Sequence, residues 1–414
     1  MQITRGLVIV GACCSWFAIP AACSSQGTTE ITVPPSGDGS LLETSVEPDA
    51  NGDAQADGQG PEPDGAISDA AAIRIDFGVT PQVSDAEGGA GGATGSAADT
   101  FAELEALSVG SRARTLAVHW DALVDAAGVP RDAEFVVLAQ VAALYRERGR
   151  SVLFSIDAVD GTLDARPANL KTSWTSTELH SAMDAVIDRA FATFGPELRY
   201  LSFGREVDRY LASVSSDERS AATDFFDGAL AYAKNHSQRQ SGTQLGVAFS
   251  LAGLATNRSP QTTTLLAASD LPIITDLPLD STFHALAPQA AVAALAALPN
   301  ALAATGKGNA QIVVQSIGYP SSTVVGSSPS AQQQFYQALS RLLDAERERF
   351  PFVVIDVASD AEVPVCAEAA QSYGAATDPF LEAALCSLGL TDSTGSEKPA
   401  WAEVLAALSL FGKP

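Results

Sequence analysis

Basic residues are scarce in this chain of 414 residues. Lys and Arg number 24 against 49 Asp and Glu, so the formal net charge is -25. A protein that binds nucleic acid neutralises phosphates with a basic stripe of side chains. The sequence contains no such basic stripe, and we therefore expect no nucleic acid among the partners.

Histidine and cysteine are also rare. The four His are dispersed, and none forms an i, i+4 pair or lies beside a Cys-x-x-Cys sequence, the spacings typical of zinc sites. The Gly-rich stretch 87–95 lacks the form of a dinucleotide turn. We therefore expect no metal and no cofactor.

The longest hydrophobic run lies at the amino terminus. Arg5 precedes an apolar stretch over 7–22, which is shorter than the ~20 residues that a spanning helix needs. Small residues lead to Cys23, and the segment resembles a bacterial lipoprotein signal peptide over 1–22. The resemblance implies a lipid anchor on Cys23, in the cell envelope, and Ser24 resembles the pattern of lipoproteins sent to the outer membrane. Cys13 is the alternative lipidated residue.

Residues 23–72 have a different composition. Gly, Pro, Ser, Thr and Ala are interspersed with acids, and residues 24–72 contain no Lys or Arg. Such a segment buries too little apolar surface to offset its ordering entropy. We expect a disordered acidic tether that holds the following domain away from a membrane.

Residues 73–414 are long enough for one large domain. Short apolar runs typical of strands alternate here with helical patterns. The expected strands are 73–79, 113–120, 150–157, 198–203, 244–250, 271–277, 310–317 and 352–357. Eight strands alternating with helices predict an α/β fold, a (β/α)8 TIM barrel, with a doubly wound open sheet as the alternative.

The stretch 198–208 carries the first site candidate. Its apolar run closes at Gly204, and Glu206 follows at the expected carboxyl end of a strand, where barrel enzymes keep their chemistry. An ion pair with Arg205 or Arg209 is the other interpretation of Glu206.

Two motifs resemble a known clan of enzymes. The sequence reads Gly-Arg-Glu-Val-Asp over 204–208 and Gln-Ser-Ile-Gly-Tyr-Pro-Ser over 315–321. Together with 389–390 and 398–401, they resemble retaining glycoside hydrolases of the clan that includes arabinogalactan endo-β-1,4-galactanases and cellulase-like barrels. The resemblance covers about 113–405. It implies a TIM barrel, an oligosaccharide or polysaccharide ligand, and a general acid/base role at the position of Glu206.

The departures from that pattern affect one site. Arg205 replaces an Asn that contacts the sugar, Ser316 stands at the position of the nucleophilic Glu, and 275–279 lacks the family's aromatic residues. Retaining hydrolysis needs two carboxyl groups about 5 to 5.5 Å apart, and a serine without a base is a poor nucleophile. We therefore expect a barrel that kept its scaffold and lost the family's hydrolysis.

One alternative hypothesis is that the protein is an active glycoside hydrolase. Asp276 or Asp356, each near an expected strand end, could supply a relocated carboxylate beside Glu206. A pair ~6.5 to 9.5 Å apart would suit an inverting mechanism. The competing interpretations are a helix cap or loop residue for Asp276 and an ion-pair partner for Asp356.

A binding protein is the hypothesis of a different class. Aromatic residues near the expected strand ends could stack on sugar rings: Trp120, Trp174, Tyr210 and Tyr319. For Trp174, packing under a loop is the favoured interpretation. We also expect ligand contacts from Arg205, Asp208 and Asp276, and a monomeric protein.

Two cysteines remain in the expected domain. Cys366 and Cys386 form an even pair in a protein expected to be exported, which predicts a disulfide between them. Two buried thiols are the alternative.

Overall fold

The computed structural model describes residues 74–81, 106–256 and 258–412. They belong to a compact unit that extends from Ile67 to Pro414. The expected signal peptide and tether, with Cys13 and Cys23, and the Gly-rich loop lie outside the described residues.

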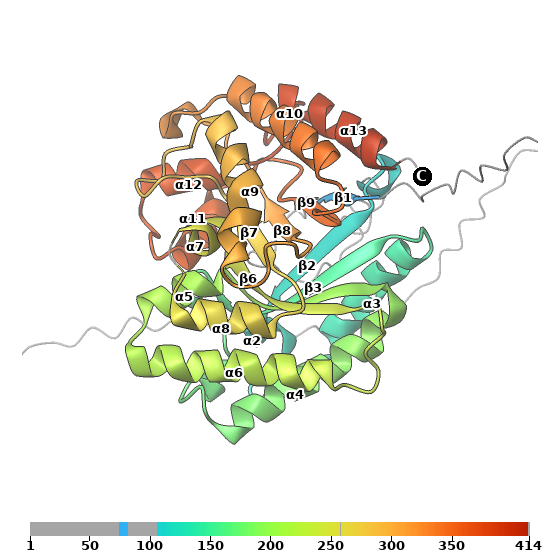
Figure 1. Ribbon diagram of the computed structural model, residues 1–414, viewed down its shortest axis with the longest axis vertical. Helices are drawn as coiled ribbons and strands as arrows, with labels where there is room; N and C mark the ends of the chain where they lie inside the picture. Colours follow the sequence, from blue (N-terminus) through green and yellow to red (C-terminus); the bar gives the residue numbers. More distant parts are fainter. Residues whose placement is uncertain (1–73, 82–105, 257, 413–414) are drawn as a thin grey trace, which may run out of the picture. The chain divides into compact units, whose positions relative to one another are not determined.

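The core of the unit is a barrel of parallel strands (Figure 1). The strands are β1 (Asp76–Val79), β2 (Ala113–His119), β3 (Ser151–Asp160), β5 (Leu198–Arg205), β6 (Gln244–Ser250), β7 (Ile273–Asp276), β8 (Val313–Ile317) and β9 (Phe352–Ile355). Their order is β1-β9-β8-β7-β6-β5-β3-β2, and the short β4 (Leu163–Asp164) pairs antiparallel with β3. The prediction of an eight-stranded (β/α)8 barrel is confirmed.

The first and last strands of this order are joined at one corner. Arg112 N donates to Phe77 O at 2.9 Å, and Val79 N donates to Ser111 Oγ at 3.2 Å. A Cβ atom on Gly78 would lie only 2.0 Å from Ala113 O. Glycine at position 78 is therefore what lets β1 approach β2 closely enough to bring the barrel near closure.

Helices alternate with the strands and surround them (Figure 1). They are α2 (Trp120–Leu123), α3 (Asp132–Arg146), α4 (Thr177–Phe194), α5 (Val207–Ser213), α6 (Ser216–Lys234), α7 (Leu251–Ala255), α8 (Pro260–Ala268), α9 (Pro288–Ala303), α10 (Pro329–Ala345), α11 (Val363–Ser372), α12 (Pro379–Leu385) and α13 (Pro399–Gly412), with the 3-10 turns η1 (Ala168–Leu170), η2 (Gly195–Glu197) and η3 (Thr323–Val325). Serine caps begin several of them. Ser176, Ser215 and Ser328, for example, each accept a bond from the backbone N–H three residues on.

The barrel interior has an apolar layer and a polar layer. Buried apolar side chains fill the first layer: Ala113, Leu153, Tyr200, Ala248, Leu271, Ile273, Val313, Phe352 and Val354. Nearer the carboxyl ends of the strands, Ser202 Oγ lies 2.7 Å from Ser155 Oγ and 3.1 Å from Gln315 Oε1. The interior therefore becomes polar toward the end of the barrel where a site is expected.

A long segment follows β9 and contains α11 and α12. The disulfide Cys366–Cys386 joins these two helices, with 5.3 Å between the Cα atoms. The predicted disulfide is confirmed. The disulfide constrains a segment that reaches back to the barrel mouth through Tyr373.

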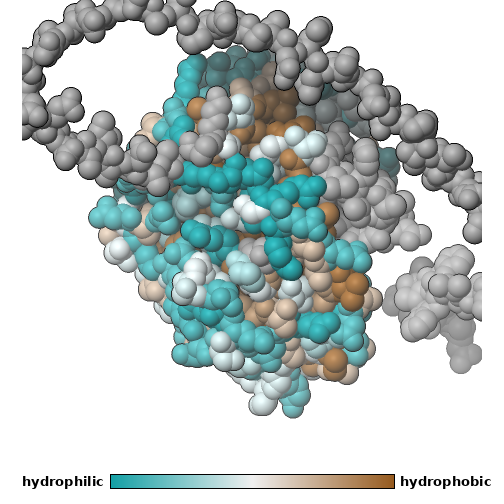
Figure 2. All heavy atoms as spheres, turned by 90° about the vertical axis from the view of Figure 1, so that its right-hand side faces the viewer, coloured by the Kyte–Doolittle hydropathy of each residue, from teal (hydrophilic) through white to brown (hydrophobic). Residues whose placement is uncertain are grey.

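The surface of one face is mostly hydrophilic, with hydrophobic residues gathered in a few patches (Figure 2). Among the described residues, no helix is both long enough and apolar enough to cross a membrane.

Candidate active site at the barrel mouth

Glu206 lies at the junction between β5 and α5. Its backbone has φ 50° and ψ 44°, a left-handed conformation that non-glycine residues rarely adopt. Strained residues of this kind cluster at functional sites, where the surrounding structure holds them in place. The side chain is buried, at 3 % exposure. The predicted site carboxylate is therefore at a strand end and inside the barrel mouth.

Two hydroxyl donors and one guanidinium surround the Glu206 carboxylate. Thr275 Oγ1 donates to Oε1 at 2.9 Å, and Tyr373 OH donates to the same oxygen at 3.4 Å. The Arg209 guanidinium forms an ion pair with Oε2 at 2.5 Å. Glu206 is the acceptor in both hydroxyl contacts, whereas a general acid donates a proton from its own carboxyl.

Tyr373 is a site residue that sequence reasoning missed. It follows α11, and the Arg209 guanidinium lies over its ring at 5.1 Å from the centroid. Burial and the Glu206 charge raise the pKa of Tyr373 well above its ordinary value, so the hydroxyl keeps its proton and donates. No motif marks this position, because the residue comes from a segment that folds back over the barrel.

Asp276 ends β7, next to the Thr275 that contacts Glu206. Its side chain is buried, with Oδ2 lacking a hydrogen-bond partner. Burial and the charge of Glu206 raise the pKa of Asp276 to about 8. At neutral pH Asp276 therefore keeps its proton and is a neutral carboxylic acid.

Ser316 occupies the end of β8 and faces a different partner. Its Oγ donates to Asp356 Oδ1 at 2.8 Å. Arg205 Nη2 lies 3.8 Å from the same Asp356 oxygen, and Arg205 Nε lies 3.9 Å from Asp160 Oδ1. Asp356 thus has the ion-pair role that was one of its two interpretations, and Ser316 is its hydrogen-bond donor.

A second cluster of ionisable residues lies on β2 and β3. His119 Nε2 is 3.2 Å from Asp160 Oδ2. Burial, the largest single effect, opposes a charge on His119, but the hydrogen bond with Asp160 and the charges of Asp160, Asp157 and Asp121 together raise the pKa of the imidazole. Burial and the Asp160 charge raise the pKa of Asp157 to about 7. The mouth therefore holds two carboxyl groups, on Asp157 and Asp276, whose charge depends on pH near neutrality.

Asp208 was expected to contact a ligand, but its carboxylate bonds to other groups of the protein. Asp208 Oδ1 accepts from Ser250 N at 2.7 Å, and Oδ2 accepts from Ser250 Oγ at 2.6 Å. The carboxylate thereby connects α5 to the end of β6. This is a structural role, although burial raises the pKa of Asp208 to about 6.

The aromatic residues predicted to stack on sugars are buried. Trp120 begins α2 and stacks on Phe225 with 5.7 Å between ring centroids. Tyr210 OH donates to Glu218 Oε1 at 2.8 Å, and Tyr319 OH donates to Leu286 O at 2.6 Å. None of these three rings offers an exposed face, which corrects the stacking role expected for them. Trp174 packs inside as well, on Tyr210 and under the Arg166 guanidinium.

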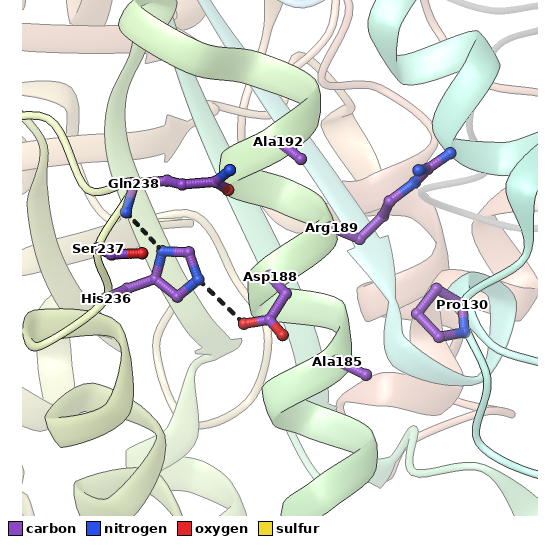
Figure 3. Close-up of a pocket in the computed structure, with 8 residues that line it drawn as sticks. All are labelled: Pro130, Ala185, Asp188, Arg189, Ala192, His236, Ser237 and Gln238. Atoms are coloured by element: carbon purple, nitrogen blue, oxygen red, sulfur yellow. Dashed lines mark hydrogen bonds and ion pairs between the residues drawn. The ribbon is translucent and has the colours of Figure 1, made fainter.

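A surface hollow lies apart from these residues, against α4 (Figure 3). His236 Nε2 is 3.0 Å from Asp188 Oδ1, and the Gln238 N–H is directed at His236 Nδ1 at 3.2 Å. None of the barrel-mouth residues lines this hollow. Its contacts connect α4 to the chain that follows α6. Among the described residues, no cluster of three or more His, Cys, Asp or Glu side chains could hold a metal ion.

Comparisons with solved structures identify the class of fold. A GH5_18 protein from Bifidobacterium longum has a TM-score of 0.61 at 14% sequence identity, covering 82% of this chain and 80% of that chain. A GH5_18 protein from Streptomyces cattleya in complex with GlcNAc has a TM-score of 0.60 at 17% identity, covering 82% and 80%. An exo-β-1,4-mannosidase from an Opitutaceae bacterium has a TM-score of 0.56 at 14% identity, covering 82% and 60%.

The fold is therefore that of a glycoside-hydrolase-like TIM barrel, as the sequence motifs predicted. No protein-family model matches the chain. No curated protein matches it either. At these identities the likeness is one of fold, and the chemistry has to be argued from the residues at the mouth.

Proposed function

We propose that this protein is a carbohydrate-binding barrel that does not carry out retaining glycoside hydrolysis. The observation that carries the proposal is the pairing at the mouth. Ser316 stands at the nucleophile position and donates to Asp356, while Glu206 accepts from Thr275 and Tyr373 and pairs with Arg209. Neither member of the expected catalytic pair is set up for its role.

The chemistry of the two positions supports this conclusion. A retaining mechanism requires one carboxylate that attacks the anomeric carbon and one carboxylic acid that protonates the leaving oxygen. The hydroxyl of Ser316 has a carboxylate partner in Asp356, without a histidine to relay its proton. Glu206 accepts from Thr275 and Tyr373 and pairs with the Arg209 guanidinium, so its contacts are those of an acceptor and not of the proton donor that the second role needs.

The proposed ligand is a β-linked oligosaccharide. Two of the structurally similar GH5_18 proteins hold Manβ1-4GlcNAc, and other similar structures are named as a β-1,4-mannosidase and an endo-β-1,4-glucanase. In this chain, the partly exposed guanidinium of Arg205 offers donors at the mouth to sugar hydroxyls. Sugars bind through such convergent polar groups in a concave site.

Calorimetric titration with Manβ1-4GlcNAc and with β-1,4-linked manno- and gluco-oligosaccharides tests this function. We expect binding by the wild type and weaker binding by Arg205→Ala. Arg148→Ala removes an exposed arginine that pairs with its neighbour Glu147 and serves as the control. If Arg205→Ala and Asp276→Ala both bind the sugars as tightly as the wild type, the barrel mouth is not the binding site.

A second candidate function is a rewired hydrolase, and the neutral Asp276 favours it. With a pKa of about 8, Asp276 carries a proton at neutral pH, whereas Glu206 is held as an acceptor. Carboxyl groups whose environments separate their proton affinities are the basis of acid/base pairs. The resemblance implies an acid/base role for Glu206. In this candidate Asp276 would be the acid and Glu206 the base.

The reaction for this candidate is an inverting hydrolysis. Glu206 takes a proton from a water molecule, whose oxygen forms a bond to the anomeric carbon. The bond from that carbon to the glycosidic oxygen breaks, and Asp276 gives its proton to the departing oxygen. Release of reducing ends that Asp276→Asn and Glu206→Gln both abolish would establish it. Release that survives in either variant would eliminate this pair.

Export and lipid anchoring form a separate part of the proposal. The amino-terminal segment, with its single Arg5 and an apolar stretch before Cys23, supports cleavage before Cys23 and a lipid anchor in the outer membrane. We expect the Cys23→Ser variant to leave the membrane fraction and the Cys13→Ser variant to lose the same signal peptide as the wild type. Mass spectrometry of the mature amino terminus distinguishes the two cysteines.

A further inference from the structure

Three loops on the carboxyl side of the barrel bring exposed apolar side chains together. Phe380, in α12, is 36% exposed and Val324, in η3, is 54% exposed. The Phe380 ring lies against the His284 imidazole, with 4.6 Å between centroids and 36° between planes. We call His284, Val324 and Phe380 the rim platform. Its members come from the connections after β7, β8 and β9, which are neighbours in the barrel.

The hairpin that carries His284 is built with strain. Leu279 and Ala285 pair across it, and Phe283 at its tip has a φ of 60°. A positive φ is an outlier for a bulky residue and persists only where surrounding contacts impose it. Here Asp280 Oδ1 accepts from the backbone N–H of His284 at 3.0 Å. The loop therefore holds His284 in one place despite the backbone cost.

The imidazole is also fixed in orientation. Its Nδ1 lies 3.1 Å from Thr282 Oγ1, and its Nε2 makes no hydrogen bond among the described residues. Ala285 N donates to Val325 O at 2.9 Å, which ties the hairpin to η3. The rim platform thus combines a partly exposed aromatic ring with a ring nitrogen available to a ligand.

The rim platform lies near the candidate active site. The hairpin starts directly after Asp276, and Leu286 N–H donates to Pro278 O at its base. Asp280 is four positions after Asp276, so their Cα atoms are at most ~14 Å apart. Tyr319 OH, which donates to Leu286 O, braces the same base. The platform therefore lies on the connection that leads directly out of the Asp276 end of β7.

We propose that the rim platform is an outer subsite for a neutral hexose ring of a bound glycan. The C–H face of a sugar packs on the ring of Phe380, and a sugar hydroxyl bonds to His284 Nε2. A neutral occupant fits because the platform contains no Lys or Arg, and the Asp280 carboxylate of the same hairpin is engaged by the backbone and the side chain of Thr282. A protein partner needs an interface of about 1,000 Å², more than three side chains provide. This subsite rests on the proposed glycan-binding function.

Ligand length gives the test. The full chain is titrated by calorimetry with a β-1,4-linked disaccharide and a β-1,4-linked pentasaccharide, each of mannose and of glucose. We expect Phe380→Ala to weaken pentasaccharide binding by about 3- to 10-fold and to leave disaccharide binding unchanged. Phe380→Tyr keeps the ring and should bind as the wild type does. Leu410→Ala, at 40% exposure on α13, is the control for loss of an exposed apolar side chain.

The outcomes separate the subsite from the function beneath it. Equal affinity of Phe380→Ala, His284→Ala and the wild type for the pentasaccharide overturns the outer subsite alone. Binding of neither sugar length by the wild type overturns the subsite and the glycan-binding function together. If Phe380→Ala lowers the melting temperature, His284→Ala provides the same comparison, because its ring is only partly buried at the loop surface.

Discussion

At the barrel mouth, Glu206 and Asp276 are both buried carboxyl groups with different surroundings. Two hydroxyls donate to Glu206 and the Arg209 guanidinium pairs with it, although its Oε2, like Oδ2 of Asp276, has no hydrogen-bond partner. Burial and the charge of Glu206 both oppose a charge on Asp276, so Asp276 holds its proton up to about pH 8. A neutral Asp276 lets the site contain two acids without two neighbouring negative charges.

The pKa of Asp276 makes stability depend on pH. It rises from 3.8 to about 8 on folding, so between these values the folded protein binds more protons than the unfolded chain. The free energy of unfolding therefore falls as pH rises through that window. Asp276→Asn removes the charge, and we expect it to raise the free energy of unfolding at pH 8.5 by on the order of a few kcal/mol.

The measurement is urea unfolding of wild type and Asp276→Asn at pH 5 and pH 8.5. The stabilisation should be larger at the higher pH, where wild-type Asp276 is ionised. Asp344→Asn is the matched control, because that carboxylate is half exposed and pairs only with the neighbouring Arg347. An equal effect of Asp276→Asn at both pH values would contradict the assigned protonation state.

Some site residues could be predicted from the sequence and others could not. Glu206 and Asp276 follow strands with clear apolar runs, and a parallel barrel gathers strand ends at one mouth. Trp120 also follows a strand, but the chain turns into α2 there and the ring enters the layer between strands and helices. Side-chain direction after a strand end depends on that turn, and alternation along the strand does not specify it.

At the scale of elements, the docking of α11 places Tyr373 over Glu206. Ser372 O accepts from Thr162 N at 2.5 Å and from Thr162 Oγ1 at 3.1 Å. A Cβ on Gly161 would lie 2.3 Å from that same carbonyl oxygen. The absence of a side chain at position 161 therefore permits the contact between the β3–β4 turn and the end of α11.

Gly161→Ala tests this docking, with Gly149→Ala as its control. Both glycines have nearly the same left-handed φ, 58° and 59°, but Gly149 has no atom within 4 Å of the added Cβ. The backbone cost, about 1 to 2 kcal/mol, should be common to both variants. We expect Gly161→Ala to destabilise by at least about 1 kcal/mol more, from the forced contact. Equal destabilisation in chemical unfolding would show that α11 does not depend on this approach.

The order of strands and helices was predictable, because each apolar run and each Ser or Pro start signal is local. The packing of α11 and α12 was less so. The pair Cys366 and Cys386 indicated a covalent link after the eighth strand, but the sequence alone does not show that the linked segment returns to the barrel mouth. Contacts such as Thr162 with Ser372 join residues 210 positions apart, which local patterns do not encode.

At the scale of the whole molecule, the likeness to glycoside hydrolases is a likeness of fold. The likeness to solved structures spans most of the chain, while the sequence identity stays at 14% to 17% in the GH5_18 structures. A barrel keeps its fold through strand and helix packing, whereas its chemistry depends on a few loop residues. The fold therefore does not decide the chemistry of this chain, and the proposal that it lacks retaining hydrolysis depends on residues such as Arg205 and Ser316.

The most direct test of the central claim is the release of reducing ends from β-1,4-linked manno- and gluco-oligosaccharides by the purified chain, measured alongside binding of the same sugars. The account predicts binding with no release above the rate in buffer. It also predicts that Ser316→Glu alone creates no activity, because the new carboxylate would face Asp356. Release of sugar by the wild type that disappears in Glu206→Gln would contradict the account.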